Sequence, residues 1–156
     1  MKTGLIFLII FSLFSCTNNV VFQQDKEIHT TWHTDSLATF CFQVSDTLTP
    51  YTSELKIRHT VAYSYQNLYV FIHKTNPSGK TITDTINCFL ADKTGKWKGK
   101  GIGDVLSYTR VIKELETYKN SGEYKIEIEQ AMRYGQTPKI EFIKEILSVG
   151  ICVKKH

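Results

Sequence analysis

The chain has 156 residues, of which 42% are hydrophobic and 22% are charged. This length is that of one ordinary domain with a core of its own. The formal net charge of +4 is only a mild basic excess, and it excludes the strongly basic surface that nucleic-acid binding requires.

The N-terminus carries a short apolar segment behind one basic residue, Lys2. Residues 4–14 are mostly Leu, Ile and Phe, and this run is about half as long as the ~20 residues that span a bilayer. It ends in Leu13-Phe14-Ser15-Cys16, followed by polar residues, which is the layout of a bacterial lipobox. We therefore interpret residues 1–15 as a lipoprotein signal peptide and Cys16 as the lipidated residue. The alternative is an ordinary secreted protein with a cysteine near its cleavage site.

Residues 17–31 are polar and have no periodic pattern, which is typical of a flexible connection. We therefore divide the chain into the signal peptide, residues 16–31 as the lipidated cysteine with a short polar tether, and residues 32–156 as the folded domain. Two or three acyl chains on Cys16 would hold that domain on a membrane surface.

Alternating apolar and polar residues predict strands from residue 37 onward. The alternation is strict in residues 39–44 and 54–58, as in strands with one buried and one wet face. Residues 67–73 are apolar on both faces, a pattern typical of a central or covered strand. Residues 80–90 are rich in Thr and Ile and also predict a strand.

The segment from Lys96 to Asp104 is the least ordinary part of the expected surface. It combines alternating Lys96, Lys98 and Lys100 with Trp97 and three glycines, but it matches neither the dinucleotide fingerprint nor the Walker pattern. Such glycines permit a bulge or a close backbone crossing at a sheet edge. One interpretation is a surface for an anionic partner or ligand formed by Lys96, Trp97, Lys98, Lys100 and Asp104. The other is a structural hairpin with Trp97 in the core.

The last third of the chain is also dominated by strand patterns. Residues 105–115 fit both a helix and a strand, and we favour a strand. Residues 122–129 and 146–154 alternate clearly, while residues 129–133 suit a short helix or turn. Seven or eight short strands separated by turn residues predict an all-β fold, namely an antiparallel β-sandwich of jelly-roll or immunoglobulin-like type.

Three cysteines remain besides Cys16, and an odd number cannot form a complete set of disulfides. Cys88 shares the apolar phase of its strand and is expected to be a small buried hydrophobe. Cys41 and Cys152 fall opposite the apolar phase, and a bridge between them requires neighbouring strands.

The sequence contains no pattern that points to catalysis or to a bound cofactor. There is no Gly-x-Ser-x-Gly elbow and no cysteine pair with metal-ligand spacing. His29 and His33 have the spacing of two ligands on a helix, but the residues around them favour extended chain. We expect no enzymatic activity, no cofactor and no metal site.

Several segments, taken in order, resemble the GldH gliding-motility lipoprotein family of Bacteroidota, and they cover nearly all of the chain after residue 31. The resemblance is carried by Trp32, Asp35-Ser36-Leu37, Phe40-x-Phe42-x-Val44, Asp46-Thr47, Pro50-Tyr51, Arg58-His59-Thr60, Tyr63, Asn67-Leu68-Tyr69-Val70-Phe71, Pro77, Gly79, Asp84-Thr85, Leu90-Ala91-Asp92, the run from Gly95 to Gly101, Gly103-Asp104, Gly122-x-Tyr124, the run from Glu129 to Arg133, and Val149-Gly150-Ile151.

The resemblance implies a membrane-anchored, non-enzymatic accessory or assembly component of the gliding motility machinery and its associated protein-secretion machinery. Its partners would be the membrane, through the lipid on Cys16, and envelope proteins of that machinery. We expect the domain in the cell envelope, facing the periplasm, with the outer membrane favoured over the inner. The alternative function is a β-sandwich lipoprotein that binds an envelope glycan or another ligand.

Overall fold

The computed structural model describes residues 19–29, 31–136 and 138–156. These residues form eleven strands and contain no helix, so within them no helix has the length and apolarity needed to cross a membrane. The signal peptide and the lipidation of Cys16 lie outside the described residues and stay predictions.

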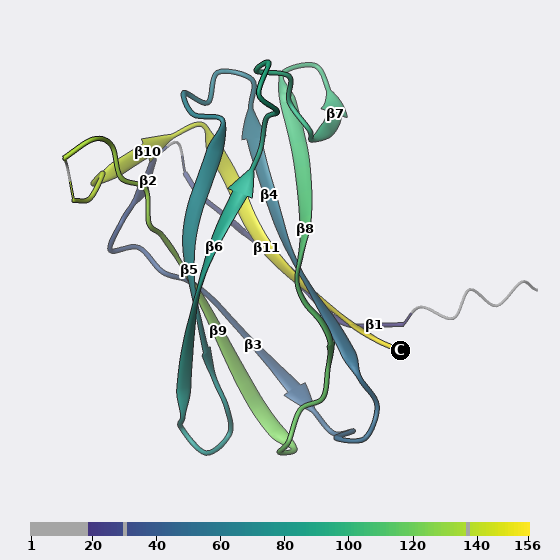
Figure 1. Ribbon diagram of the computed structural model, residues 1–156. Coiled ribbons are helices and arrows are strands. Elements are labelled where there is room, and N and C mark those ends of the chain that lie inside the picture. Colours follow the sequence, from purple (N-terminus) through teal and green to yellow (C-terminus); the bar gives the residue numbers. More distant parts are fainter. Residues whose placement is uncertain (1–18, 30, 137) are drawn as a thin grey trace, which may run out of the picture.

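The strands form two large antiparallel sheets and one small one (Figure 1). The five-stranded sheet has the order β1 (Val20–Glu27), β11 (Ile146–Lys155), β4 (Tyr51–Thr60), β8 (Val105–Glu116) and β7 (Lys100–Ile102). The four-stranded sheet has the order β3 (Ala38–Val44), β9 (Gly122–Gln130), β5 (Asn67–Thr75) and β6 (Thr81–Phe89). The small sheet pairs β10 (Phe142–Lys144) with β2 (Thr31–His33).

The two large sheets face each other across one apolar core. Alternate residues of each strand point into it, and it contains buried Phe40, Leu55, Ile128 and Val149 from four different strands. At one side the two sheets meet through Phe22 of β1, whose ring stacks on that of Phe42 of β3 with centroids 5.3 Å apart. The predicted all-β, antiparallel architecture is confirmed, and the two packed layers fit a sandwich.

The predicted tether is wrong for residues 20–27, because they form β1. This strand pairs along its length with β11, from Val20 opposite Lys154 to Glu27 opposite Ser148. An edge strand needs few buried side chains, since one edge and one face stay wet. Only Phe22 of this polar segment packs against the core, which explains why the segment lacks an apolar period. The folded domain therefore begins near residue 20 rather than at residue 32.

The short helix or turn expected in residues 129–133 is also absent, because β9 continues to Gln130 and residues 131–133 have no regular structure. Its last residues pair with β5, Glu129 opposite Phe71 and Gln130 opposite Val70. Pairing with an interior strand outweighs the weak helical propensity of the local sequence. The preferred strand for residues 105–115 is confirmed, since β8 covers all of them.

All three cysteines in the described residues are free. Cys88 is buried, as expected. Cys152 is also buried, contrary to its apparent phase, because it lies on β11 between β1 and β4. Cys41 is exposed on β3, which belongs to the other sheet, so the bridge between Cys41 and Cys152 does not form.

Candidate functional site

The predicted surface from Lys96 to Asp104 forms the end of the five-stranded sheet and the turn before it. The Trp97 ring is half-buried against the core, and its centroid lies 4.8 Å from that of the His59 ring. The side chains of Lys96, Lys98, Lys100 and Asp104 are exposed. Trp97 thus packs against the core, as in the hairpin interpretation, while the charged side chains of the segment are accessible to solvent. Its role as a partner or ligand surface stays a prediction.

Gly101 explains why this segment is rich in glycine. A Cβ atom at Gly101 would lie only 1.8 Å from the backbone oxygen of Val105, so β7 can approach β8 here only without a side chain. Gly103 follows with a φ of +62°, a left-handed conformation that suits glycine. The close backbone crossing that the glycines predicted is therefore present, at the edge of the five-stranded sheet.

His59, which packs against Trp97, is the most buried titratable side chain near this segment. Its Nδ1 lies 2.9 Å from the backbone oxygen of Thr60 and donates to it in the neutral tautomer, while its Nε2 has no partner among the described residues. Burial lowers the pKa of His59 below its usual 6.5, because a charged imidazolium would lose its hydration. The ring therefore serves as a neutral part of the core.

A second surface, which the sequence did not single out, is a groove on the outer face of the four-stranded sheet. Its volume is about 480 Å³, and its lining includes Tyr69, Phe71, Thr85 and Arg133. Tyr69 is 39% exposed, and Phe71 is half-buried. The groove thus combines an aromatic floor with one positive charge, a composition typical of recognition sites.

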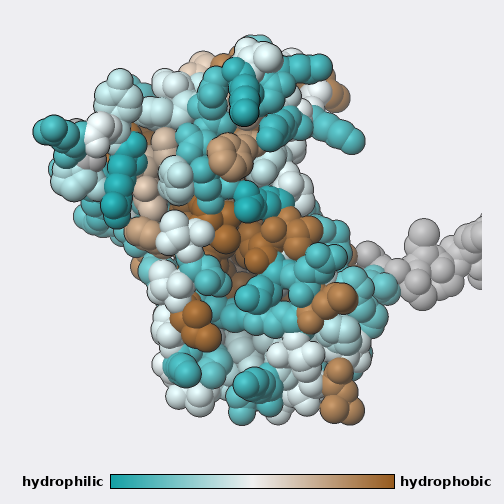
Figure 2. Space-filling view, in the orientation of Figure 1, coloured by the Kyte–Doolittle hydropathy of each residue, from teal (hydrophilic) through white to brown (hydrophobic). Residues whose placement is uncertain are grey.

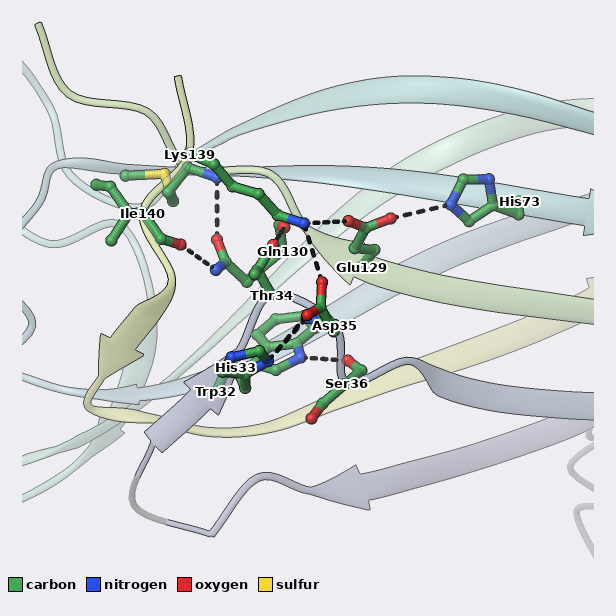
Figure 3. A network of polar contacts seen from close by, with 11 residues as sticks. Trp32, His33, Thr34, Asp35, Ser36, His73, Glu129, Gln130, Lys139 and Ile140 are labelled. Atoms are coloured by element: carbon green, nitrogen blue, oxygen red, sulfur yellow. Dashed lines mark hydrogen bonds and ion pairs between the residues drawn. The ribbon is translucent and has the colours of Figure 1, made fainter. Parts of the chain in front are cut away.

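Residues 131–136 and 138–141, called segment 131–141 below, contribute Ala131 and Arg133 to one wall of this groove, and Gln130 holds the segment in place (Figure 3). The Gln130 side chain is fully buried. Its Nε2 donates to the backbone oxygen of Ile140 at 2.7 Å, and its Oε1 accepts from the backbone N–H of Met132 at 3.0 Å. One side chain therefore fastens both ends of the segment that carries Arg133.

A chain of charged groups lies beside the same segment (Figure 3). Lys139 Nζ lies 3.0 Å from Asp35 Oδ1 and 3.7 Å from Glu129 Oε1. Glu129 Oε2 in turn lies 3.4 Å from Nε2 of His73. The hydrogen bond and the charge of Lys139 lower the pKa of Asp35, and the same bond raises the pKa of Lys139. These contacts join the segment to β9, through Glu129 to β5, and to the turn after β2.

A hydroxyl, an imidazole and a carboxylate are aligned on this face in Thr83, His73 and Glu129. Thr83 Oγ1 lies 2.9 Å from His73 Nδ1. These contacts are, however, those of an ordinary polar sheet face. His73 lies directly opposite Thr83 on β6 and Glu127 on β9, and Glu129 is the next residue of β9 on the same face. Within the described residues, no group of three His, Cys, Asp or Glu side chains could hold a metal ion.

The sequence contained a signal for part of this groove. Tyr69 and Phe71 made residues 67–73 apolar on both faces, and the interior position of β5 follows from that pattern. Arg133 and Gln130 had no such signal, since the pairing of β9 and the fold of segment 131–141 place them.

Comparison with known proteins gives a consistent result over nearly the whole chain. The model of a family described as "GldH lipoprotein" matches residues 20–153. A "Gliding motility lipoprotein GldH homolog" from Christiangramia forsetii is 34% identical over 154 residues, which are 96% of this chain and 94% of that protein. The "Gliding motility lipoprotein GldH" of Flavobacterium johnsoniae is 32% identical over 155 residues, 99% and 96% of the two chains.

Among solved structures, the chain is similar to the infectious bursal disease virus VP2 subviral particle. The TM-score is 0.41 at 18% identity, over 86% of this chain and 30% of that one. This likeness is too distant to support an argument about fold subtype or function.

Proposed function

Because the chain belongs to the GldH lipoprotein family, as its sequence motifs predicted, we propose that it is a non-enzymatic accessory or assembly component of the gliding motility machinery and its associated protein-secretion machinery. In this proposal a lipid on Cys16 anchors it, the outer membrane holds the lipid, and the folded domain faces the periplasm. The observation that carries the proposal is the match to two gliding motility lipoproteins over at least 94% of every chain involved.

The geometry of the domain supports a role in contact rather than in chemistry. The recognition groove is open, and the polar groups beside it are committed to cross-strand pairs and to holding segment 131–141. Arg133 projects from that segment as an exposed cation next to the partly exposed side chains of Tyr69 and Phe71. Buried aromatic and arginine side chains at the centre of an interface contribute most to protein–protein affinity. We therefore place one contact with the envelope machinery at this groove.

The test is complementation of a Flavobacterium johnsoniae strain that lacks its own gliding motility lipoprotein GldH. The wild-type chain should restore colony spreading and secretion, while Cys16→Ser should release the protein from membranes in salt and fail to restore either. Arg133→Ala with Tyr69→Ala should remain membrane-bound and folded but lose activity. A matched surface control is Glu123→Ala with Lys119→Ala, both exposed and remote from the groove.

Two results would count against the proposal. One is unchanged spreading and secretion in a strain without any copy of the protein. The other is full restoration by Cys16→Ser, which would remove the anchor from the mechanism. The alternative of glycan or ligand binding gains no support from the family match.

A further inference from the structure

The two large sheets are open toward solvent on the side where β6 and β8 lie next to each other (Figure 1). β6 is the last strand of its sheet and is paired only with β5. β8 is covered by β7 at residues 105–107 alone, so most of its outer edge is unpaired as well. Figure 2 shows an apolar hollow on this side of the molecule. Its lining includes Ile86 of β6 and Ile112 of β8.

The direction of the free backbone groups on β6 follows from one contact. Arg110 on β8 donates through Nη1 to the backbone oxygen of Asn87, so this oxygen points away from β5. Backbone groups alternate in direction along a strand. The N–H and C=O groups of Thr81, Thr83 and Thr85 therefore also point outward. Arg110 thus occupies the outward backbone oxygen at Asn87, and the outward backbone groups of the three threonines are the ones available to another strand.

β6 has only one of the features that usually protect an edge strand from pairing, the inward-pointing charge of Asp84. Its nine residues pair with β5 without a bulge, and they include no proline and no lysine. Asp84 is the only charged residue among them. All side chains from Thr81 to Thr85 are exposed. A long, regular edge with a single charge is a template for a further strand that can pair with that charge.

The side chains of β6 that point toward the other sheet indicate which side chains an added strand should have. Ile82 is 54% exposed although it shares the phase of buried Cys88, and Asp84 and Ile86 follow at alternate positions. Asp84 forms no ion pair among the described residues. The sequence of this face is thus apolar, acidic, apolar. Its cross-strand complement is apolar, basic, apolar.

We propose that β6 binds an extended segment of an envelope partner protein, which adds to the four-stranded sheet as a fifth strand. The segment pairs with the outward backbone groups of Thr81, Thr83 and Thr85, places a lysine or arginine next to Asp84, and covers Ile82 and Ile86 with apolar side chains on either side of that cation. This site deepens the proposed function, since it states the chemistry of one partner. It is separate from the groove around Arg133.

The probe is a capped peptide with the sequence Thr-Ile-Thr-Lys-Thr-Ile-Thr between Gly-Ser ends. The pattern is symmetric, so the peptide can pair in either strand direction. Binding to the full-length protein in detergent micelles is followed by fluorescence anisotropy, and amide hydrogen exchange locates the contact. We expect the peptide to slow exchange at Thr81, Thr83 and Thr85. A peptide with glutamate for lysine should bind about two- to fivefold more weakly. A peptide with proline in place of the lysine and both adjacent threonines lacks the N–H groups that face β6 in either strand direction, and it should not bind.

Two variants of the protein test the same contact from the other side. Thr83→Pro removes one outward N–H at an edge position where proline is tolerated, and it should abolish binding of the lysine peptide. Asp84→Lys keeps the backbone intact and should reverse the preference to the glutamate peptide. Glu123→Lys on β9 is the matched charge control and should change nothing, because Glu123 is exposed and forms no ion pair with any residue that the structure describes.

Three outcomes would overturn the proposal. The first is absence of slowed exchange at β6 at millimolar peptide in folded protein. The second is equal binding of the lysine and glutamate peptides to both the wild-type chain and Asp84→Lys. The third is concentration-dependent slowing of exchange at β6 without peptide, which would assign the edge to a second copy of this chain. The peptide assay needs no living cell, so its failure is distinguishable from failure of the complementation test.

Discussion

Gln130 is the side chain on which the candidate groove depends most directly, and replacing it with leucine tests this. Gln130→Leu keeps the buried volume nearly constant but removes both hydrogen bonds to the wall segment 131–141. The backbone oxygen of Ile140 and the N–H of Met132 then lose their partners, at a cost of about 1–2 kcal/mol each. The expected loss in free energy of unfolding is therefore about 2–4 kcal/mol.

Urea denaturation of the full chain in micelles, followed by tryptophan fluorescence, measures this loss. The midpoint should fall while the slope with denaturant stays constant, since the surface exposed on unfolding is unchanged. The melting temperature should fall by roughly 3 °C per kcal/mol. Hydrogen exchange should speed up in segment 131–141 more than in β4 or β11. Gln43→Leu on β3, where the side chain is exposed, is the control and should lie within about 0.5 kcal/mol of wild type.

The reasoning is refuted if Gln130→Leu is as stable as Gln43→Leu and exchanges no faster in segment 131–141. That result would mean that the segment is held by its other contacts, namely its backbone hydrogen bonds and the ion pairs of Lys139, and not by the amide of Gln130.

Three further predictions concern single sites. Burial lowers the pKa of His59, so below pH 6.5 the unfolded chain binds a proton that the folded chain does not. The free energy of unfolding should therefore fall as the pH drops below 6.5, by up to about 1.4 kcal/mol per pH unit. His59→Phe should make the urea midpoint less dependent on pH in this range, and an unchanged pH dependence would contradict the assignment. Gly101→Ala should disrupt the pairing of β7 with β8, because the new Cβ would clash with the backbone oxygen of Val105, and amide hydrogen exchange in β7 should become faster. A stability equal to that of the wild type would show that β7 can move away from β8 without cost. Native labelling with a maleimide at pH 8 should modify Cys41 at once, but Cys88 only after unfolding, because burial raises its pKa to about 12; equal rates would argue against the sheet positions of the two thiols.

Local patterns were sufficient where a strand has one buried and one wet face. The alternation in residues 122–129 and 146–154 identified most of β9 and β11, and the two-faced apolar pattern of residues 67–73 indicated the interior position of β5. The ordered motifs from Trp32 to Ile151 identified the family, because together they occur in one fixed order and spacing along the chain.

The errors all involve residues whose environment comes from a distant strand. β1 looked like a tether because an edge strand needs only one core contact, here from Phe22 to Phe42. Cys152 looked exposed because nothing local reveals that β1 and β4 flank β11 on both sides.

The sequence by itself determined that this protein is a β-structured member of a lipoprotein family, since side-chain alternation and motif order are properties of the chain. Only the tertiary structure decided where recognition can occur. Gln130 forms its buried hydrogen bonds only because segment 131–141 folds back onto the end of β9. β6 has an unpaired edge only because it is the last strand of its sheet. Both features depend on which strands become neighbours, and strand pairing joins residues that are far apart in the sequence.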